Sequence, residues 1–105
     1  MSQFDLYINP DKQTSKAYPY FVDVQNELLD VLNSRLVIPL TPVARSDKPY
    51  PEHLCPIFKI SGKDHALLTH QMASVSVALL KEKKSSFVQH RNEIVAAIDF
   101  LVTGI

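Results

Sequence analysis

The sequence predicts an antiparallel β domain that ends in one helix. All seven prolines lie within the first 56 residues, and because proline disrupts helix interiors, this part of the chain is expected to form strands and loops. The last third contains no proline, and its apolar residues recur at helical spacing. We expect one domain over residues 1–105, with strands over about residues 3–80 and a C-terminal helix over about residues 86–103.

The composition argues against several classes of protein. Eleven Lys and Arg balance eleven Asp and Glu, which disfavours a general nucleic-acid binder, because such proteins usually carry excess positive charge. No apolar run approaches the ~18 residues that a membrane span needs, and the N-terminus lacks the basic and apolar regions of a signal peptide. The single cysteine excludes an internal disulfide and a multi-cysteine zinc site. We therefore expect a cytoplasmic protein.

Short runs of aromatic and β-branched residues predict the strands. The clearest turn is Ser61-Gly62-Lys63-Asp64, which predicts a hairpin that continues over residues 66–69. Pro39 cannot donate a ladder hydrogen bond, so it is expected at a sheet edge or a bulge. The predicted strands cover residues 4–8, 20–24, 36–40, 54–60 and 74–80, with loops at residues 9–17 and 43–53 and a charged link at residues 81–84.

Residues 26–32 fit two different structures. Their apolar positions are 28, 29, 31 and 32. This spacing suits one helical turn after an Asn cap, and it also suits a strand that is buried on both faces. Periodicity does not distinguish the two over so few residues.

The predicted helix has recognisable ends. Ser86 resembles an N-cap, and Gln89, three residues later, completes a capping-box pattern. Gly104 is the expected C-terminal stop. Between these ends the apolar positions 87, 94, 95, 98, 101, 102 and 105 cluster on one helical face.

A search for metal-binding or nucleophilic patterns finds little. His65 and His70 are expected on opposite faces of a strand, so we interpret them as surface histidines and not as metal ligands. His53 and Cys55 share one face of a predicted strand, as a thiolate pair would need, but a half-buried cysteine beside a loop histidine is the simpler interpretation. Two isolated glycines do not make a phosphate-binding loop. We predict no metal and no cofactor.

A ribonuclease would need a base, an acid and a cation close together. His90, Arg91 and Glu93 supply these types on the predicted helix. Their spacing points them in different directions, and such polar residues are common at the start of a helix. Ribonuclease activity therefore stays only as an alternative.

The C-terminus is more apolar than most chain ends. Val102 and Ile105 lie beside a helix stop. They fit two interpretations, one in which the tail docks into the core of its own domain and one in which it is an exposed tip that enters a partner's pocket. Composition does not separate the two.

Several short motifs, in order and at matching spacing, resemble the CcdB family of toxin–antitoxin toxins. The resemblance covers nearly the whole chain. The motifs are Gln3-Phe4, Phe21-Val22-Asp23-Val24-Gln25, Val37-Ile38-Pro39-Leu40, Ser46-Asp47-Lys48, Met72-Ala73-Ser74-Val75 and Gly104-Ile105.

The resemblance implies a β-rich α+β fold, with an SH3-like antiparallel barrel or sheet, a small extra sheet and one C-terminal helix. It implies extended structure at residues 26–32. It also implies a homodimer that binds the A subunit of DNA gyrase, traps the gyrase–DNA cleavage complex and catalyses nothing itself. Direct nucleic-acid or membrane binding is not expected. The second implied partner is a CcdA-like antitoxin, partly disordered, for which the loops at residues 9–17 and 43–53 are candidate rims.

The resemblance also implies which residues contact gyrase. In the family's best-known member an aromatic Phe-Trp pair precedes the final Gly-Ile, whereas this chain has Val102 and Thr103 there and contains no tryptophan. That tryptophan stacks on a gyrase arginine, a contact type that contributes about 0.5–2 kcal/mol. Asp99 could pair with an arginine and partly replace the stacking. The implied gyrase-binding residues are Leu28, Leu29, Asp99, Val102, Thr103, Gly104 and Ile105.

Two alternatives remain at this point. One is an endoribonuclease toxin of the related fold, and the other is a dimeric homologue that has lost toxicity. The motifs favour the gyrase poison over both.

Overall fold

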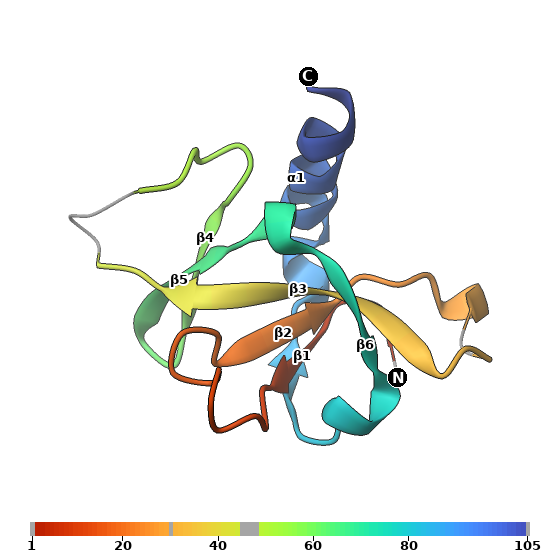
Figure 1. Ribbon diagram of the computed structural model, residues 1–105. Helices are drawn as coiled ribbons and strands as arrows, with labels where there is room; N and C mark the ends of the chain where they lie inside the picture. The colour runs from red at the N-terminus through yellow and green to blue at the C-terminus, as the bar shows by residue number, and fades with distance from the viewer. Residues whose placement is uncertain (1, 30, 45–48, 105) are drawn as a thin grey trace.

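The computed structural model describes residues 2–29, 31–44 and 49–104. A curled antiparallel sheet lies beside one C-terminal helix, whose far end extends beyond the sheet (Figure 1). The strands are β1 (Asp5–Ile8), β2 (Tyr20–Asp23), β3 (Ser34–Pro42), β4 (Ile57–Ile60), β5 (Lys63–Leu67), β6 (Ala73–Ser76) and β7 (Lys83–Ser86), and the α-helix is α1 (Arg91–Thr103). Short 3-10 turns are η1 (Glu27–Leu29), η2 (Thr69–Gln71), η3 (Val77–Leu79) and η4 (Val88–His90). The β-rich fold with one C-terminal helix is as predicted.

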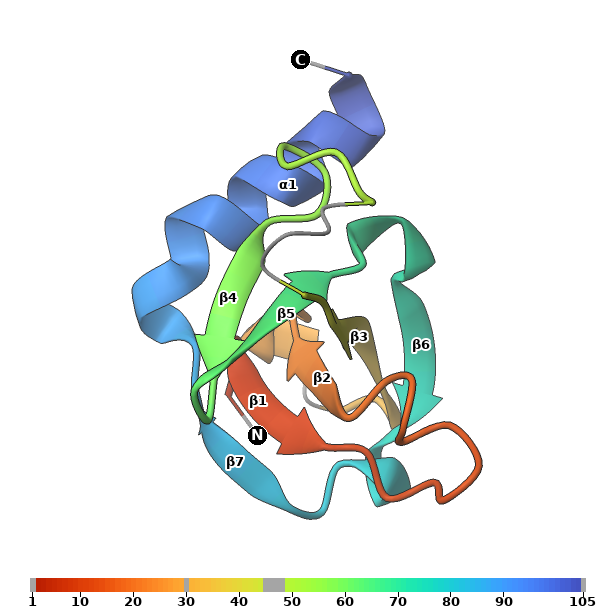
Figure 2. The same ribbon diagram turned by 90° about the vertical axis from the view of Figure 1, so that its left-hand side faces the viewer.

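The strand order β4-β5-β3-β2-β1-β7 makes β3 the centre of the sheet. One side of β3 pairs with β2, while the other side pairs first with β6 and then with β5. β6 therefore lies off the main path, but it belongs to the same sheet as the other described strands. The sheet is strongly curled, as the turned view shows (Figure 2).

Pro39 lies in the middle of β3, so the predicted edge or bulge position is wrong. It pairs with Phe21 of β2, and its carbonyl accepts a hydrogen bond of 2.9 Å from the Leu68 N–H on the opposite side. That side is where β3 changes partner from β6 to β5. The missing N–H of the proline faces this interruption, so no ladder hydrogen bond is lost.

The predicted hairpin at residues 61–64 is confirmed. Ile60 pairs with Lys63, which leaves Ser61 and Gly62 as a two-residue loop. Both have positive φ angles, 52° and 80°. A type I′ turn requires this geometry and matches the twist of the flanking strands.

The main core lies between the sheet and α1. Ile94 and Phe87 from the C-terminal region pack with Leu6, Ile38 and other strand residues. Within α1 the residues that are fully buried are Ile94 and Ala97, so only the middle of the helix is held tightly. The last helical turn projects beyond the sheet in both views (Figures 1 and 2).

Several predicted boundaries need correction. Residues 83–86 form strand β7 and not a charged link, because they pair with β1 at the sheet edge. The predicted strands at residues 54–60 and 74–80 are shorter, since β4 begins at Ile57 and η3 replaces the end of the second. The Ser86 hydroxyl accepts a hydrogen bond of 3.2 Å from the Val88 N–H, so it starts η4, and α1 itself begins only at Arg91.

The described part of this segment, residues 26–29 and 31–32, is not extended, which corrects the structure implied by the resemblance. Residues 27–29 form the 3-10 turn η1. The Asn26 side chain accepts a hydrogen bond of 2.9 Å from the Leu28 N–H, and the Leu29 N–H donates to the Asn26 carbonyl over 3.0 Å. The local sequence pattern, one helical turn after an Asn cap, therefore predicts residues 27–29 correctly.

Candidate functional site

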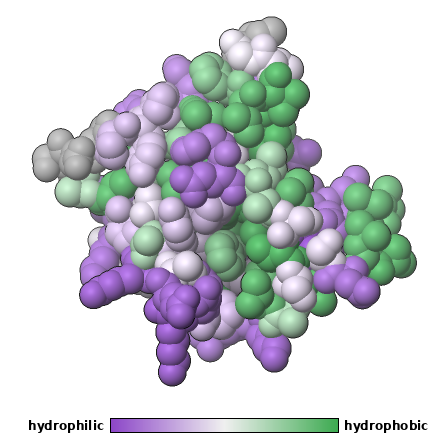
Figure 3. Space-filling model, viewed as in Figure 1, coloured by the Kyte–Doolittle hydropathy of each residue, from purple (hydrophilic) through white to green (hydrophobic). Residues whose placement is uncertain are grey.

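An exposed apolar segment lies between β2 and β3, and we call it the apolar turn (residues 26–29 and 31–32). Leu28 is 85% exposed and Val31 is 89% exposed, and Leu29 and Leu32 are also exposed. The segment projects from the molecule as an apolar knob, at the right in Figure 3. Four large apolar side chains gathered in water are costly, and such patches commonly mark interaction sites.

A buried ion pair lies next to the apolar turn, between β2 and β3. Arg35 Nε and Nη2 each lie 2.8 Å from Asp23 Oδ2. Asp23 Oδ1 accepts a hydrogen bond of 3.0 Å from the Gln25 N–H. Burial raises the pKa of the Asp23 carboxyl, while its hydrogen bond to Arg35 opposes that shift. Neither the pairing nor its burial is evident from the sequence.

The end of α1 forms a second exposed site. Val102 is 74% exposed, so it does not dock into the core of its own domain. The described part of the tail is thus an exposed tip, and its entry into a partner's pocket stays a prediction. The Thr103 hydroxyl donates to the Asp99 carbonyl over 2.6 Å. Gly104 has φ 73°, and its N–H donates to the Phe100 carbonyl over 2.9 Å. Gly104 is thus the predicted left-handed helix stop.

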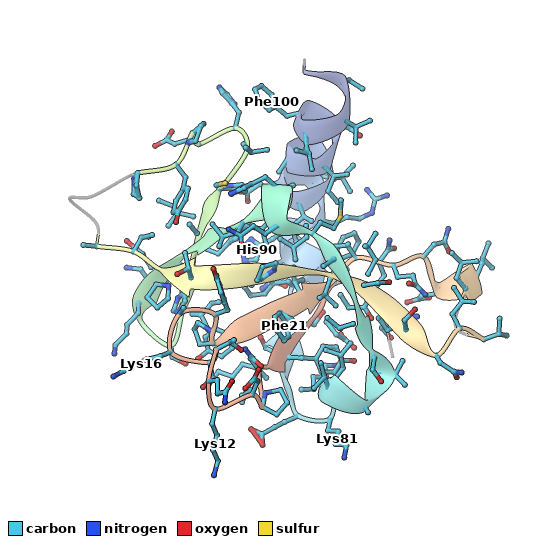
Figure 4. All side chains as sticks on the ribbon, viewed as in Figure 1. Lys12, Lys16, Phe21, Lys81, His90 and Phe100 are labelled. Atoms are coloured by element: carbon cyan, nitrogen blue, oxygen red, sulfur yellow. The ribbon has the colours of Figure 1, made fainter. Side chains whose placement is uncertain are left out.

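The end of α1 is braced from one side by the loop that precedes β4. The Phe100 ring stacks on the His53 ring, with centroids 6.0 Å apart and an interplanar angle of 26°. Phe100 lies near the upper end of the helix in Figure 4. Asp99, Val102, Thr103 and Gly104 are all exposed on this end of the helix. The predicted contact residue Ile105 lies outside the described residues.

The structure does not bring the two groups of predicted contact residues together within one chain. Leu28 and Leu29 share the apolar turn, and Asp99, Val102, Thr103 and Gly104 share the end of α1. The two views show the end of α1 well above the η1 segment (Figures 1 and 2). A single partner that touches both groups would have to span this separation.

His70 is exposed, as predicted, but His65, His53 and Cys55 do not form the predicted arrangements. His65 is buried and not at the surface, and its Nδ1 lies 2.9 Å from the Lys63 carbonyl. Cys55 and His53 do not share a strand, since both precede β4. Instead, Cys55 Sγ lies 3.6 Å from His70 Nδ1. Burial raises the pKa of the Cys55 thiol, which does not suit a reactive thiolate.

The described residues offer no metal centre, because no group of three or more His, Cys, Asp or Glu gathers among them. Of the polar residues at the helix start, His90 packs against aromatic rings. His90 contacts the rings of Phe58 and Phe87, with centroids 4.6 and 4.9 Å apart, and its Nδ1 lies 3.7 Å from Glu93 Oε1. Arg91 is exposed.

The chain belongs to the CcdB family, because a model of the family described as CcdB protein matches residues 3–104. Membership implies a toxin of a toxin–antitoxin pair, with an antitoxin as partner. Members of the family are gyrase poisons or inhibitors and not enzymes. Among the helices that the structure describes, none has the length and apolar character needed to cross a membrane.

Proposed function

We propose that the protein is a non-enzymatic toxin that binds the A subunit of DNA gyrase and traps the gyrase–DNA cleavage complex. The family match over residues 3–104 carries this proposal. The exposed apolar turn and the exposed end of α1 support it, because both contain the residues to which the resemblance assigns gyrase contact. We place its action in the cytoplasm, where gyrase and DNA meet.

A homodimer would make each of these contacts twice on a two-fold symmetric target. One chain alone presents the apolar turn and the end of α1 far apart. Two chains related by a two-fold axis present two copies of each on a larger surface, and the separation within one chain then poses no difficulty. We propose that the dimer is the active form.

The contact at the end of α1 is chemically different from the family's aromatic one. Val102 offers a small apolar surface, and the Thr103 hydroxyl is engaged by the Asp99 carbonyl. Losing one stacked cation–π contact costs about 0.5–2 kcal/mol. The exposed Asp99 carboxylate can recover part of this by pairing with an arginine of gyrase.

A CcdA-like antitoxin would bind elsewhere on the chain. The loop at residues 9–17 is closed by Asn9, whose Nδ2 donates to the Tyr18 carbonyl over 2.8 Å. Lys12 and Lys16 extend from this loop into solvent at the end of the molecule opposite the C-terminus (Figure 4). A disordered antitoxin segment can wrap such a rim and the loop at residues 43–53, of which residues 45–48 lie outside the described residues.

A DNA-cleavage assay tests the proposal directly. Purified gyrase, supercoiled plasmid, ATP and increasing amounts of the protein are incubated, and the products are examined after detergent and protease treatment. We expect linear DNA that depends on the protein and appears only after that treatment. Absence of linear DNA with gyrases from more than one host would contradict the proposal, and RNA cleavage by the same preparation would favour the endoribonuclease alternative.

A further inference from the structure

We propose that Gln25 is a positioning residue that holds the apolar turn in the conformation that meets its partner, with the Asp23–Arg35 pair as its base. The identification of that partner as gyrase A rests on the proposed function. The positioning itself concerns the free protein and is tested separately below.

Gln25 uses all four of its polar groups to join the turn to the sheet. Its side-chain Nε2 donates to the Leu29 carbonyl in the turn over 3.1 Å, and its Oε1 accepts from the Leu36 N–H in β3 over 3.0 Å. Its backbone N–H donates to Asp23 Oδ1, and its carbonyl accepts from Arg35 Nη2 over 3.3 Å. Gln25 is only 7% exposed. A single buried side chain thus bridges the exposed turn and the central strand.

At the base of the apolar turn, polar groups are buried and apolar side chains are exposed, which is the reverse of the usual pattern. Two charged groups and an amide are buried, while four large apolar side chains project into water. A buried ion pair contributes little net stability, because desolvation offsets its Coulombic attraction. Exposed leucines and valines contribute none. Neither the buried ion pair nor the exposed apolar side chains add much to the stability of the fold. We infer that together they hold the apolar turn in a defined conformation.

The apolar turn has few means of holding its own shape. Within it, the Leu29 N–H donates to the Asn26 carbonyl and the Leu32 N–H donates to the Leu29 carbonyl over 3.1 Å. An isolated single turn of this kind is unstable in water. The Leu29 carbonyl also accepts from Gln25, so the same atom that closes the turn is the one that Gln25 fixes. Releasing it would let the apolar side chains sample many orientations.

A fixed turn binds more tightly than a mobile one. Binding a mobile surface costs free energy, because its side chains must be ordered. A preorganised surface avoids this cost, because its side chains are ordered before binding. Gln25 therefore acts on the partner through Leu28 and Leu29, without touching the partner itself.

The test compares two Gln25 variants with a matched control. Gln25→Met removes both side-chain hydrogen bonds at similar length, and Gln25→Glu keeps an acceptor for Leu36 but removes the donor to Leu29. The control is His65→Leu, which removes a buried polar side chain at the other end of β3, where Pro42 pairs with His65. If Gln25→Met does not fold, Gln25→Glu carries the comparison with the control.

Amide hydrogen exchange in the free protein is the first measurement. We expect the Leu29 and Leu32 amides to exchange about tenfold faster in both Gln25 variants, as the loss of one buried hydrogen bond predicts. The Leu68 amide, bonded to the Pro39 carbonyl, reports the central sheet and should be affected less. His65→Leu should leave the Leu29 and Leu32 amides unchanged. Unchanged exchange of these two amides in the Gln25 variants would overturn the proposal, as would equal acceleration by His65→Leu.

Binding to isolated gyrase A is the second measurement. We expect both Gln25 variants to bind about tenfold more weakly than the wild type, and His65→Leu to bind as the wild type does. Wild-type affinity in variants whose turn has loosened would overturn the functional half of the proposal. If the wild type itself does not bind gyrase A, the proposed function fails, and the exchange data alone decide whether Gln25 holds the turn.

Discussion

Arg35 Nε lies 2.8 Å from Asp23 Oδ2, and both side chains are excluded from solvent. The two residues come from adjacent strands, β3 and β2, at the end of the sheet from which the apolar turn projects. Desolvation makes this pair costly to build, and the cost rises steeply when one partner is removed, because the other charge then stays buried without a counter-ion. The pair is therefore a sensitive point for stability.

Replacing Arg35 by methionine should destabilise the fold by about 3–5 kcal/mol. The uncompensated Asp23 carboxylate is the cause, so urea unfolding at neutral pH should show a much lower midpoint with an unchanged slope. The matched control is Lys83→Met, which removes the partner of Asp5 in a pair of 3.2 Å at the sheet edge. Lys83 is half exposed there, so its removal should cost below about 1 kcal/mol. Equal losses in the two variants would contradict this assignment.

Replacing Leu28 by aspartate should leave stability within about 0.5 kcal/mol, since the side chain is almost fully exposed. Gyrase binding should weaken strongly, because a charge replaces an apolar anchor. Val88→Asp is a suitable control, since Val88 is also an exposed apolar residue but lies in η4, away from the proposed contacts. Thermal unfolding checks stability, and calorimetric titration with gyrase A checks binding. Equal loss of affinity in both variants would mean that the contact is not specific to the turn.

Local sequence signals predicted those parts of the fold that are formed locally. The hairpin at Ser61-Gly62 and the helix stop at Gly104 each depend on a backbone angle that few residues adopt. Strand β7 was not predicted, because it is an edge strand of lysines and serines with no apolar alternation. It forms by pairing with β1. A short stretch of sequence does not predict such pairing between distant segments.

The residues of the candidate site were named from the family resemblance, and their contact with gyrase stays a prediction; how the fold holds them does not follow from the sequence. Leucines and valines at positions 28, 29, 31 and 32 are more typical of a core than of a surface, so their exposure does not follow from the sequence pattern alone. The ion pair joins Asp23 and Arg35 from separate strands, and only a charge inside the apolar run Phe21-Val22-Asp23-Val24 signals that a buried partner is needed. The contact between Cys55 and His70 also depends on the tertiary fold.

Deleting residues 104–105 should abolish toxicity and leave the fold intact. The described tail residues are exposed, and the loss of the Gly104 cap removes one hydrogen bond to the Phe100 carbonyl, worth about 0.5–1.5 kcal/mol. Growth arrest on expression in a gyrase-sensitive host measures toxicity, while circular dichroism and antitoxin binding measure folding. Gly104→Ala keeps the chain length and strains the left-handed position at φ 73°, so it separates the effect of the helix stop from the effect of losing the tail. An unfolded truncated protein would show that the tail belongs to the core.

Native Cys55 should react with iodoacetamide at pH 8 at least about tenfold more slowly than the same cysteine in urea. Burial raises the pKa of the thiol, so less thiolate is present in the folded protein at this pH, and the buried side chain is reached only through opening of the structure. The protonated thiol makes its full contribution to stability at pH values below the pKa of cysteine in the unfolded chain. This contribution is lost as the pH rises through the raised pKa of Cys55 in the folded protein. Mass spectrometry of timed samples measures the alkylation, and Cys55→Ala shows whether any loss of stability at alkaline pH belongs to this group. Rapid alkylation of the native protein at pH 8 would contradict the assignment of Cys55 as a packed, protonated thiol beside His70.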